Sequence, residues 1–311
     1  MHAVEIAKND LRLNVRNAFL SVLEADAQVK VLEESRARAE ERLRKATAEL
    51  NAGTSARVDV LRFETQLKQA EVDLFAGKNS LQLAKNSFNN TLARPIETPV
   101  QLSTAHIGEL ITDETLVDTL VAHALKFRPE LKSVRYQLMA LRNIRKATEG
   151  GLKPSLSFNA THQRNIDAQG FSSKSTSTFG TLALSLPLFD SGLTRAKVKQ
   201  AREDEYQATQ QLAQAELGIS LDVRQAYTNY LFASQRLALA TKAEESALET
   251  HRISKLRNDV HEGIVLEVID SQTELTRAKT AVVLATYDQL KALAALQHAL
   301  GTDGLIGGEQ K

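Results

Sequence analysis

The chain repeats itself at a distance of 208 residues, and this duplication limits what it can fold into. The string Leu13-Asn14-Val15-Arg16-Asn17-Ala18-Phe19 reappears as Leu221-Asp222-Val223-Arg224-Gln225-Ala226-Tyr227, an offset of 223 − 15 = 208. The same register continues to Leu92, which matches Leu300. Two helices rich in Ala and Leu could align by composition alone, but the shared Val-Arg-x-Ala-aromatic string favours a true internal repeat.

Each repeat unit has the pattern of a helix, a short break and a second helix. In the first unit, helical periodicity runs over residues 4–50 and resumes over residues 58–92. Gly53 lies in the break and suits a left-handed helix cap. Pro95 ends the second helix, because proline cannot continue the hydrogen-bond ladder. The pattern predicts a long helical hairpin over residues 1–95.

The second unit predicts a longer hairpin, over residues 191–303. One helix is expected over 193–257, a turn around Gly263, and a return helix over 266–300. At 1.5 Å per residue the first of these helices would be about 100 Å long, too long for a globular domain. We therefore expect helices that pack side by side in an elongated, coiled-coil-like arrangement.

The segment between the two hairpins is mixed in character. Residues 96–133 form a linker region in which 113–126 predict a short amphipathic helix. Pro129 then suits the first position of another helix, which includes residues 134–151 and leads into the next segment. After the second hairpin, residues 304–311 predict a flexible tail.

A β-hairpin is predicted over residues 152–190, because the hydrophobic period changes from 3.6 to 2. Strands are expected over 155–162 and 181–188, with an exposed loop over 164–178. A soluble hairpin with one face on a core fits the alternation equally well. Two strands alone are unstable and leave open edges, however, so partner strands are needed, and a homo-oligomeric membrane barrel would supply them. The lipid-facing residues would then include Leu156, Phe158, Leu182, Leu184, Leu186 and Leu188.

Composition and residue spacing argue against catalysis and against nucleic-acid binding. The chain has 39 basic and 38 acidic residues, so no overall field recruits nucleic acid. It has no cysteine, and its seven histidines show no metal-ligand spacing. Neither a phosphate-binding glycine loop nor a nucleophile elbow occurs. We expect no enzymatic activity, no cofactor and no metal site.

Several strings together resemble the TolC-like family of outer-membrane efflux proteins. They are Arg128-Pro129-Glu130-Leu131, the strand exit Leu184-Ser185-Leu186-Pro187-Leu188-Phe189-Asp190-Ser191-Gly192, and the paired Val-Arg-x-Ala-aromatic helices. The resemblance implies a mostly α fold with a β-hairpin, in which a homotrimer forms a helical periplasmic tunnel and an outer-membrane β-barrel. It also implies a passive exit duct for efflux or type I secretion, working with a periplasmic adaptor and an inner-membrane transporter. The alternative is a soluble or periplasmic coiled-coil interaction or adaptor protein.

The same resemblance implies an acidic aperture beside the second turn. Glu267 and Asp270 match the positions where family members narrow the periplasmic mouth, and each would form a three-fold ring. The like charges of such a ring would repel one another and favour opening, or would bind cations. The alternative is that both are solvated acids near a helix N-terminus, where the helix dipole favours them. Asp59 and Arg62 begin the corresponding helix of the first repeat. The two turns differ, because Gly53 and Gly263 do not lie 208 residues apart.

The duplication also predicts a missing segment. Subtracting 208 from the hairpin gives positions before residue 1, so a first hairpin and a signal peptide are expected upstream of Met1. Neither an apolar run of the roughly 20 residues that span a membrane nor a signal peptide occurs within the chain. Three copies with two strands each would give six strands, fewer than the eight of the smallest ordinary barrels. We expect this form alone not to insert or conduct.

Overall fold

The computed structural model describes residues 2–101, 117–164, 176–260 and 262–301. The chain forms two compact units, which are considered separately below. The first contains residues 1–129 together with 218–311, and the second contains residues 130–217.

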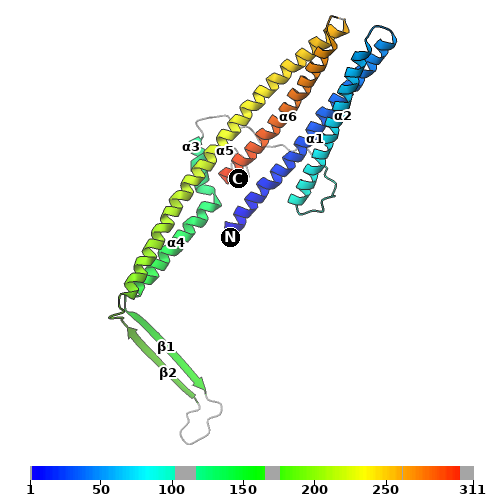
Figure 1. Cartoon of the computed structure of the whole chain (residues 1–311). Helices are drawn as coiled ribbons and strands as arrows, with labels where there is room; N and C mark the ends of the chain where they lie inside the picture. The colour runs from blue at the N-terminus through cyan, green and yellow to red at the C-terminus, as the bar shows by residue number, and fades with distance from the viewer. Residues whose placement is uncertain (1, 102–116, 165–175, 261, 302–311) are drawn as a thin grey trace, which may run out of the picture. The chain divides into compact units, whose positions relative to one another are not determined.

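The first unit contains two antiparallel helical hairpins (Figure 1). One consists of α1 (His2–Asn51) and α2 (Arg57–Thr91). The other consists of the part of α5 (Leu193–Asp259) from Gly218 onward and of α6 (Val265–Leu300). The ends that face each turn obey the sequence repeat, since 259 − 51 and 265 − 57 both equal 208. The duplication is therefore a duplication of structure.

A seam of small apolar side chains joins the two helices of each hairpin. In the first hairpin it is a buried cluster of Ala39, Leu67 and Ala70. In the second it is Ala247, Leu275 and Ala278, which are the same three positions 208 residues later. Alanine lets two helix backbones approach closely, and a leucine fills the space between them. This explains why the chain is rich in Ala and Leu and poor in aromatic residues.

The two hairpins pack against each other along α1 and α6, which Figure 1 shows side by side. Ser35 Oγ lies 3.1 Å from Thr276 Oγ1, and Lys279 donates a 2.8 Å hydrogen bond to Glu34. That hydrogen bond from Lys279 is the main cause that lowers the pKa of the Glu34 carboxyl. Further along, Lys291 pairs with Glu24 at 2.6 Å. Polar contacts thus fix the register between the repeats.

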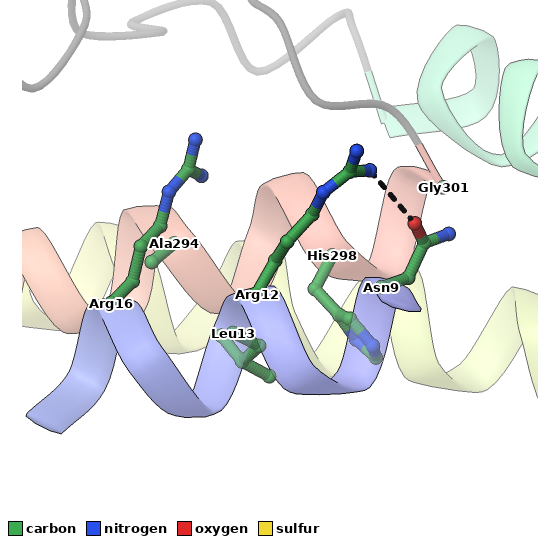
Figure 2. Close-up of a pocket in the computed structure, with 7 residues that line it drawn as sticks. All are labelled: Asn9, Arg12, Leu13, Arg16, Ala294, His298 and Gly301. Carbon is green, nitrogen blue, oxygen red and sulfur yellow. Dashed lines mark hydrogen bonds between the residues drawn. The ribbon is translucent and has the colours of Figure 1, made fainter. Parts of the chain in front are cut away.

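The contact between α1 and α6 continues to the end of α6 (Figure 2). Arg12 and Arg16 project from α1 there, while Ala294 and His298 belong to α6. Arg16 donates a 2.6 Å hydrogen bond to Gln297, a side chain that is buried. Arg16 belongs to the first copy of the Val-Arg-x-Ala-aromatic string. Its hydrogen bond therefore connects α1 of the first hairpin to α6 of the second hairpin.

The second unit contains α4 (Pro129–Gly150), two strands and the beginning of α5. An ion-pair network joins α4 to α5: Arg145 bonds Glu205 and Glu149, and Arg202 also reaches Glu149 at 3.2 Å. Hydrogen bonds from Arg145 and then Arg202 lower the pKa of Glu149. The network orders these two helices directly beside the strands.

Asp190 caps the N-terminus of α5. Its carboxylate accepts hydrogen bonds from the backbone N–H groups of Thr194 (2.7 Å) and Gly192 (3.1 Å). Bonding to Thr194 is the largest cause that lowers the pKa of Asp190. Ser191 and Gly192 both have positive φ, 56° and 82°, so the chain reverses sharply between strand and helix.

The two strands, β1 (Ser155–Arg164) and β2 (Thr176–Ser185), form an antiparallel pair. The sequence placed the end of the second strand at residue 188, and this is wrong by three residues. Pro187 has no N–H to donate, so the ladder stops before it. The loop expected over 164–178 is also too long, because Arg164 and residues 176–178 belong to the strands. Residues 165–175 of that loop lie outside the described residues.

In the linker region, the expected short helix is α3 (Val117–Phe127), which packs on α6. Its first expected residues, 113–116, lie outside the described part of the chain, as does the tail over 304–311. The preceding segment is held by Asn89 of α2, a buried side chain that donates to the carbonyl oxygens of Ile96 (2.8 Å) and Thr98 (2.9 Å). This amide satisfies backbone acceptors where regular structure has ended.

Two helix caps offer a matched test of backbone strain. Gly53 caps α1 with φ +77°, and Ala93 follows α2 with φ 52°, although alanine disfavours the left-handed region. We expect Gly53→Ala to lower the free energy of unfolding by about 1 kcal/mol and Ala93→Gly to raise it by up to about 1 kcal/mol. Thermal unfolding followed by circular dichroism measures both. Shifts of the same sign in the two variants would contradict this account.

Candidate functional site

The turns of the two hairpins lie at the same end of the first unit (Figure 1). The first joins Asn51 to Arg57 and the second joins Asp259 to Val265, so both contain five residues. The helices that leave these turns carry the charged residues singled out in the sequence. This end of the unit is therefore the candidate site.

The two turn glycines serve different physical needs. The positive φ of Gly53 closes a Schellman motif, in which Thr54 N–H bonds the Glu49 carbonyl at 2.9 Å and Gly53 N–H bonds Leu50 at 3.0 Å. Gly263 is needed for close approach instead. A Cβ atom there would lie 3.1 Å from Arg257 Cβ and 3.1 Å from the Asn258 nitrogen. The turns are thus equal in length and built differently.

The four charged residues singled out in the sequence have different surroundings. Asp59 and Arg62 pair with each other at 3.6 Å on α2, so Arg62 is engaged within its own helix. Glu267 lies in the first turn of α6 and pairs with Arg257 of α5 at 3.3 Å. Asp270 is exposed, and among the described residues no cation lies within ion-pair distance of it. Asp270 therefore presents the least neutralised charge of the four.

Arg257 is a functional candidate that the sequence reasoning missed. It lies in the last turn of α5, where a cation is favoured by the helix dipole. Its guanidinium reaches across the turn to Glu267 and also donates a 3.4 Å hydrogen bond to the carbonyl of Glu262. The sequence does contain a sign of this pair, because a basic residue near the end of one predicted helix is followed by an acidic residue near the start of the next.

A second missed feature is an ion-pair tie between α1 and α5. Asp259, the last residue of α5, lies 2.6 Å from Lys45 Nζ and 3.5 Å from Arg42 Nη1. Burial by itself would raise the pKa of Asp259. The hydrogen bond from Lys45 and the charges of Lys45, Arg42 and Lys255 outweigh it, so the pKa lies below its ordinary value. The Asp259 carboxylate therefore links the first hairpin to the second, directly before the second turn.

The β-hairpin presents one continuous apolar face. The cross-strand register pairs Leu156 with Leu184 and Phe158 with Leu182, so the four side chains share that face. Each is about 70% exposed, at 68%, 74%, 69% and 69% in that order. Such exposure of large apolar groups needs a covering partner or lipid.

Leu186 and Leu188 were placed on the same strand face, and this is wrong. The strand ends at Ser185, so neither residue belongs to the ladder that sets the alternation. Leu188 and Phe189 are exposed, 90% and 88%, in the connection that leads to Asp190 and α5. Pro187 separates these residues from the strand, as described above.

The remaining sequence motifs meet around the second copy of the repeat string. Arg128, whose side chain is 8% exposed, bonds Asp222 at 3.0 Å. Two residues later Arg224 bonds Asp118 of α3 at 2.7 Å. Val223 and Tyr227 of the same string are buried. These motif residues therefore hold α3 and its connection against α5 and have a structural role.

Nothing among the described residues suggests catalytic chemistry. No group of three or more His, Asp or Glu side chains in the described ranges could hold a metal ion. In the same part of the chain, none of the helices combines the length and the apolar character needed to cross a membrane. The charged groups at the turns are arranged as helix-end pairs, without a nucleophile and base in contact.

Comparison with known proteins gives consistent matches. A family model described as outer membrane efflux protein matches residues 120–302, from α3 to the end of α6. The outer membrane efflux protein BepC of Brucella suis is 22% identical over 293 residues, which cover 91% of this chain and 61% of BepC. The outer membrane protein TolC of Vibrio cholerae is 26% identical over 302 residues, which cover 94% of this chain and 68% of TolC. The chain thus spans roughly three fifths to two thirds of the length of these relatives.

The fold is also shared with a solved channel structure. The open state of the Neisseria gonorrhoeae MtrE outer membrane channel superposes with a TM-score of 0.79 at 19% identity, covering 97% of this chain and 68% of MtrE. At this identity the likeness establishes the fold alone. The expected mostly α fold with long helical hairpins and a two-stranded hairpin is confirmed.

The tie at Asp259 has a defined pH dependence. Because its folded pKa is lowered, Asp259 stabilises the fold above its ordinary pKa of 3.8 and loses this contribution as the pH falls through the folded value. We expect Asp259→Asn to lower the free energy of unfolding by about 1 kcal/mol at pH 7. The difference from the unsubstituted chain should decrease as the pH falls below 3.8 and vanish below the lower pKa of the folded state.

Urea unfolding at a series of pH values measures this effect. Glu249→Gln is the matched control, because Glu249 forms an exposed pair with Arg252 three residues away on the same helix. We expect that control to change the unfolding midpoint much less. An Asp259→Asn effect that persists unchanged at pH 3 would contradict the ion-pair explanation.

Proposed function

Because the chain belongs to the outer membrane efflux protein family, we propose that it is the protomer of an outer-membrane channel for efflux or type I secretion. The observation that carries this proposal is the combination of two long helical hairpins with a strand pair whose apolar face is uncovered. The channel would be a passive exit duct without a cofactor. It would lie in the outer membrane, with its helices in the periplasm.

The strand pair supports assembly with further copies. A two-stranded hairpin is marginally stable, and each strand of the described sheet has one edge without a partner strand. Copies arranged around an axis would pair these edges and turn the Leu and Phe face toward lipid. We infer a homotrimer, as the family resemblance implies, with Leu156, Phe158, Leu182 and Leu184 in contact with outer-membrane lipid.

The helices also carry uncovered apolar side chains that fit contacts between copies. Phe75 of α2 is 78% exposed, and Val72 and Leu83 lie near it along the same helix. On α5, Phe232 and Leu239 are exposed one heptad apart. Exposed apolar residues that recur along one helix fit a contact with a second chain. In the proposed assembly these faces would pack between neighbouring hairpins and form the wall of the tunnel.

The helix starts beside the turns would form the periplasmic aperture. Asp270 would contribute a three-fold ring of carboxylates with little internal neutralisation, while Arg257 partly neutralises Glu267. Asp59 and Arg62 would contribute pairs that are neutral overall. We therefore assign cation binding at the aperture chiefly to Asp270, with Glu267 second.

The proposed channel function also implies protein partners. The turn end would meet a periplasmic adaptor, and the adaptor would connect the duct to an inner-membrane transporter. Nucleic acid is not a partner of this arrangement. The alternative, a soluble or periplasmic coiled-coil adaptor, would leave the apolar strand face without a function, so the channel is favoured.

Membrane fractionation tests the channel assignment. Supplied with the upstream hairpin that the duplication predicts, the protein should be extracted by detergent from the outer-membrane fraction as a species of three copies, measured by light scattering after gel filtration. Recovery as a soluble monomer or dimer would contradict the channel and support the adaptor alternative.

Two adjacent strand residues provide matched variants for the same experiment. Leu184 lies on the apolar face and Ser185 on the opposite face. Leu184→Arg places a charge in lipid at a cost of about 2–4 kcal/mol and should strongly reduce the membrane-bound fraction. Ser185→Arg should leave it nearly unchanged. Equal behaviour of the two variants would contradict the assigned lipid face.

Single-channel recording tests the aperture, on a form of the protein to which the upstream hairpin predicted by the duplication has been added so that it can insert. We expect Asp270→Asn to weaken block by Mg²⁺ applied from the periplasmic side about tenfold or more, because three carboxylates are removed together. Glu267→Gln should weaken it less. Glu274→Gln is the control, since Glu274 pairs with Arg277 on the same helix at 2.8 Å. Unchanged block and conductance in Asp270→Asn would remove Asp270 from the aperture.

A further inference from the structure

A small cavity lies between α1 and α5 near the turn end of the first unit. It has a volume of about 180 Å³, and Gln272 of α6 contributes to its wall. Arg38 and Arg42 line it from α1, and His251 and Lys255 line it from α5. The proposed channel function assigns no role to this cavity.

Positive charge exceeds negative charge around the cavity. Four cations line it, Arg38, Arg42, Lys45 and Lys255, against the two acids Glu41 and Asp259. The carboxylate of Asp259 is already engaged by Lys45 and Arg42. Lys255 has no hydrogen-bonded acid among the described residues, and Glu41 is exposed. The cavity therefore keeps an excess of positive charge that its own walls do not neutralise.

Both arginines hold N–H groups that are buried without an acceptor. Arg38 donates through Nη2 to Glu34 at 2.9 Å, but its Nε group meets no acceptor. Arg42 directs Nη1 toward Asp259, while its Nη2 group meets none. Leaving a buried charged donor unpaired is costly, and guanidinium groups match the oxygen spacing of oxyanions. Both unmet donors belong to side chains that line the cavity, so an anion that enters it would meet two guanidinium groups whose hydrogen bonding is incomplete.

His251 lies in the wall of the cavity, close to the positive charges of Arg38, Arg42 and Lys255. Its Nδ1 lies 3.2 Å from the hydroxyl of Ser271, which itself donates to the carbonyl of Val268 at 3.1 Å. Burial is the main cause that lowers the pKa of His251, and the charges of Arg42, Arg38 and Lys255 lower it further. A ring surrounded by three cations favours an anion as its neighbour.

We propose that this cavity binds one small inorganic oxyanion of the phosphate or sulfate class per chain, held by Arg38, Arg42 and Lys255. The bound anion would connect α1 to α5 in addition to the tie made by Asp259. The site lies within a single chain, so it does not depend on assembly or on the channel function.

Equilibrium dialysis with radiolabelled phosphate, at constant ionic strength in sodium chloride, tests the site. We expect saturable binding of about one phosphate per chain, competed by sulfate at similar concentrations and much less by chloride. Arg42→Met should weaken binding at least tenfold. Arg252→Met is the matched control, because Arg252 lies on α5 and pairs with Glu249 away from the cavity. That control should bind phosphate like the unsubstituted chain.

Lys255→Met keeps the test decisive if Arg42→Met disturbs folding, because Lys255 is exposed and forms no ion pair with any residue that the structure describes. We expect a weakening of about threefold to tenfold, with an unchanged thermal midpoint in the absence of phosphate. Absence of saturable binding, full binding in a folded Lys255→Met or Arg42→Met variant, or equal loss in Arg252→Met would each overturn the proposal.

Discussion

Two narrow seams of small apolar side chains hold the helices of this chain in pairs, and the rest of the structure depends on them. Helices of 50 and 67 residues have no globular core to bury against, so each must find its stability along its length. Ala39, Leu67 and Ala70 in the first hairpin, and the three equivalent residues of the second, provide the close contact. The polar contacts between α1 and α6 then set the two hairpins in register, so both turns lie at one end and the charged helix starts are brought together there.

The seams also explain why the protomer fits a larger assembly. Close pairing uses one stripe of each helix, which leaves other apolar residues, such as Phe75 and Phe232, without cover. The strand pair has the same property, since its Leu and Phe face and its two outer edges meet no described part of the chain. Both parts of the molecule therefore point to the same kind of solution, in which neighbouring copies complete what one chain leaves open.

Periodicity predicted the helices, the strand pair and the repeat, because these depend on local spacing of apolar residues. It failed where a single residue overrides the pattern: Pro187 ends β2 at Ser185 and removes Leu186 and Leu188 from the strand face. Ion pairs between residues far apart in the sequence could not be predicted from periodicity either. Lys45 and Asp259 are 214 residues apart, and only the register of the packed hairpins brings them together. At the candidate aperture the sequence identified the acids, but not that Arg257 neutralises one of them or that Arg62 pairs with Asp59.

The equal length of the two turns and the shared seam positions constrain how the molecule can change its size. Deleting one heptad between Ala39 and the first turn would move Ala39 out of step with Leu67 and Ala70 and would place the two turns at different heights. Only coordinated changes, made in all four long helices by whole heptads, would keep both seams and both turns level. The depth of the proposed tunnel would therefore change in steps, and a designer could shorten or lengthen it only by whole heptads.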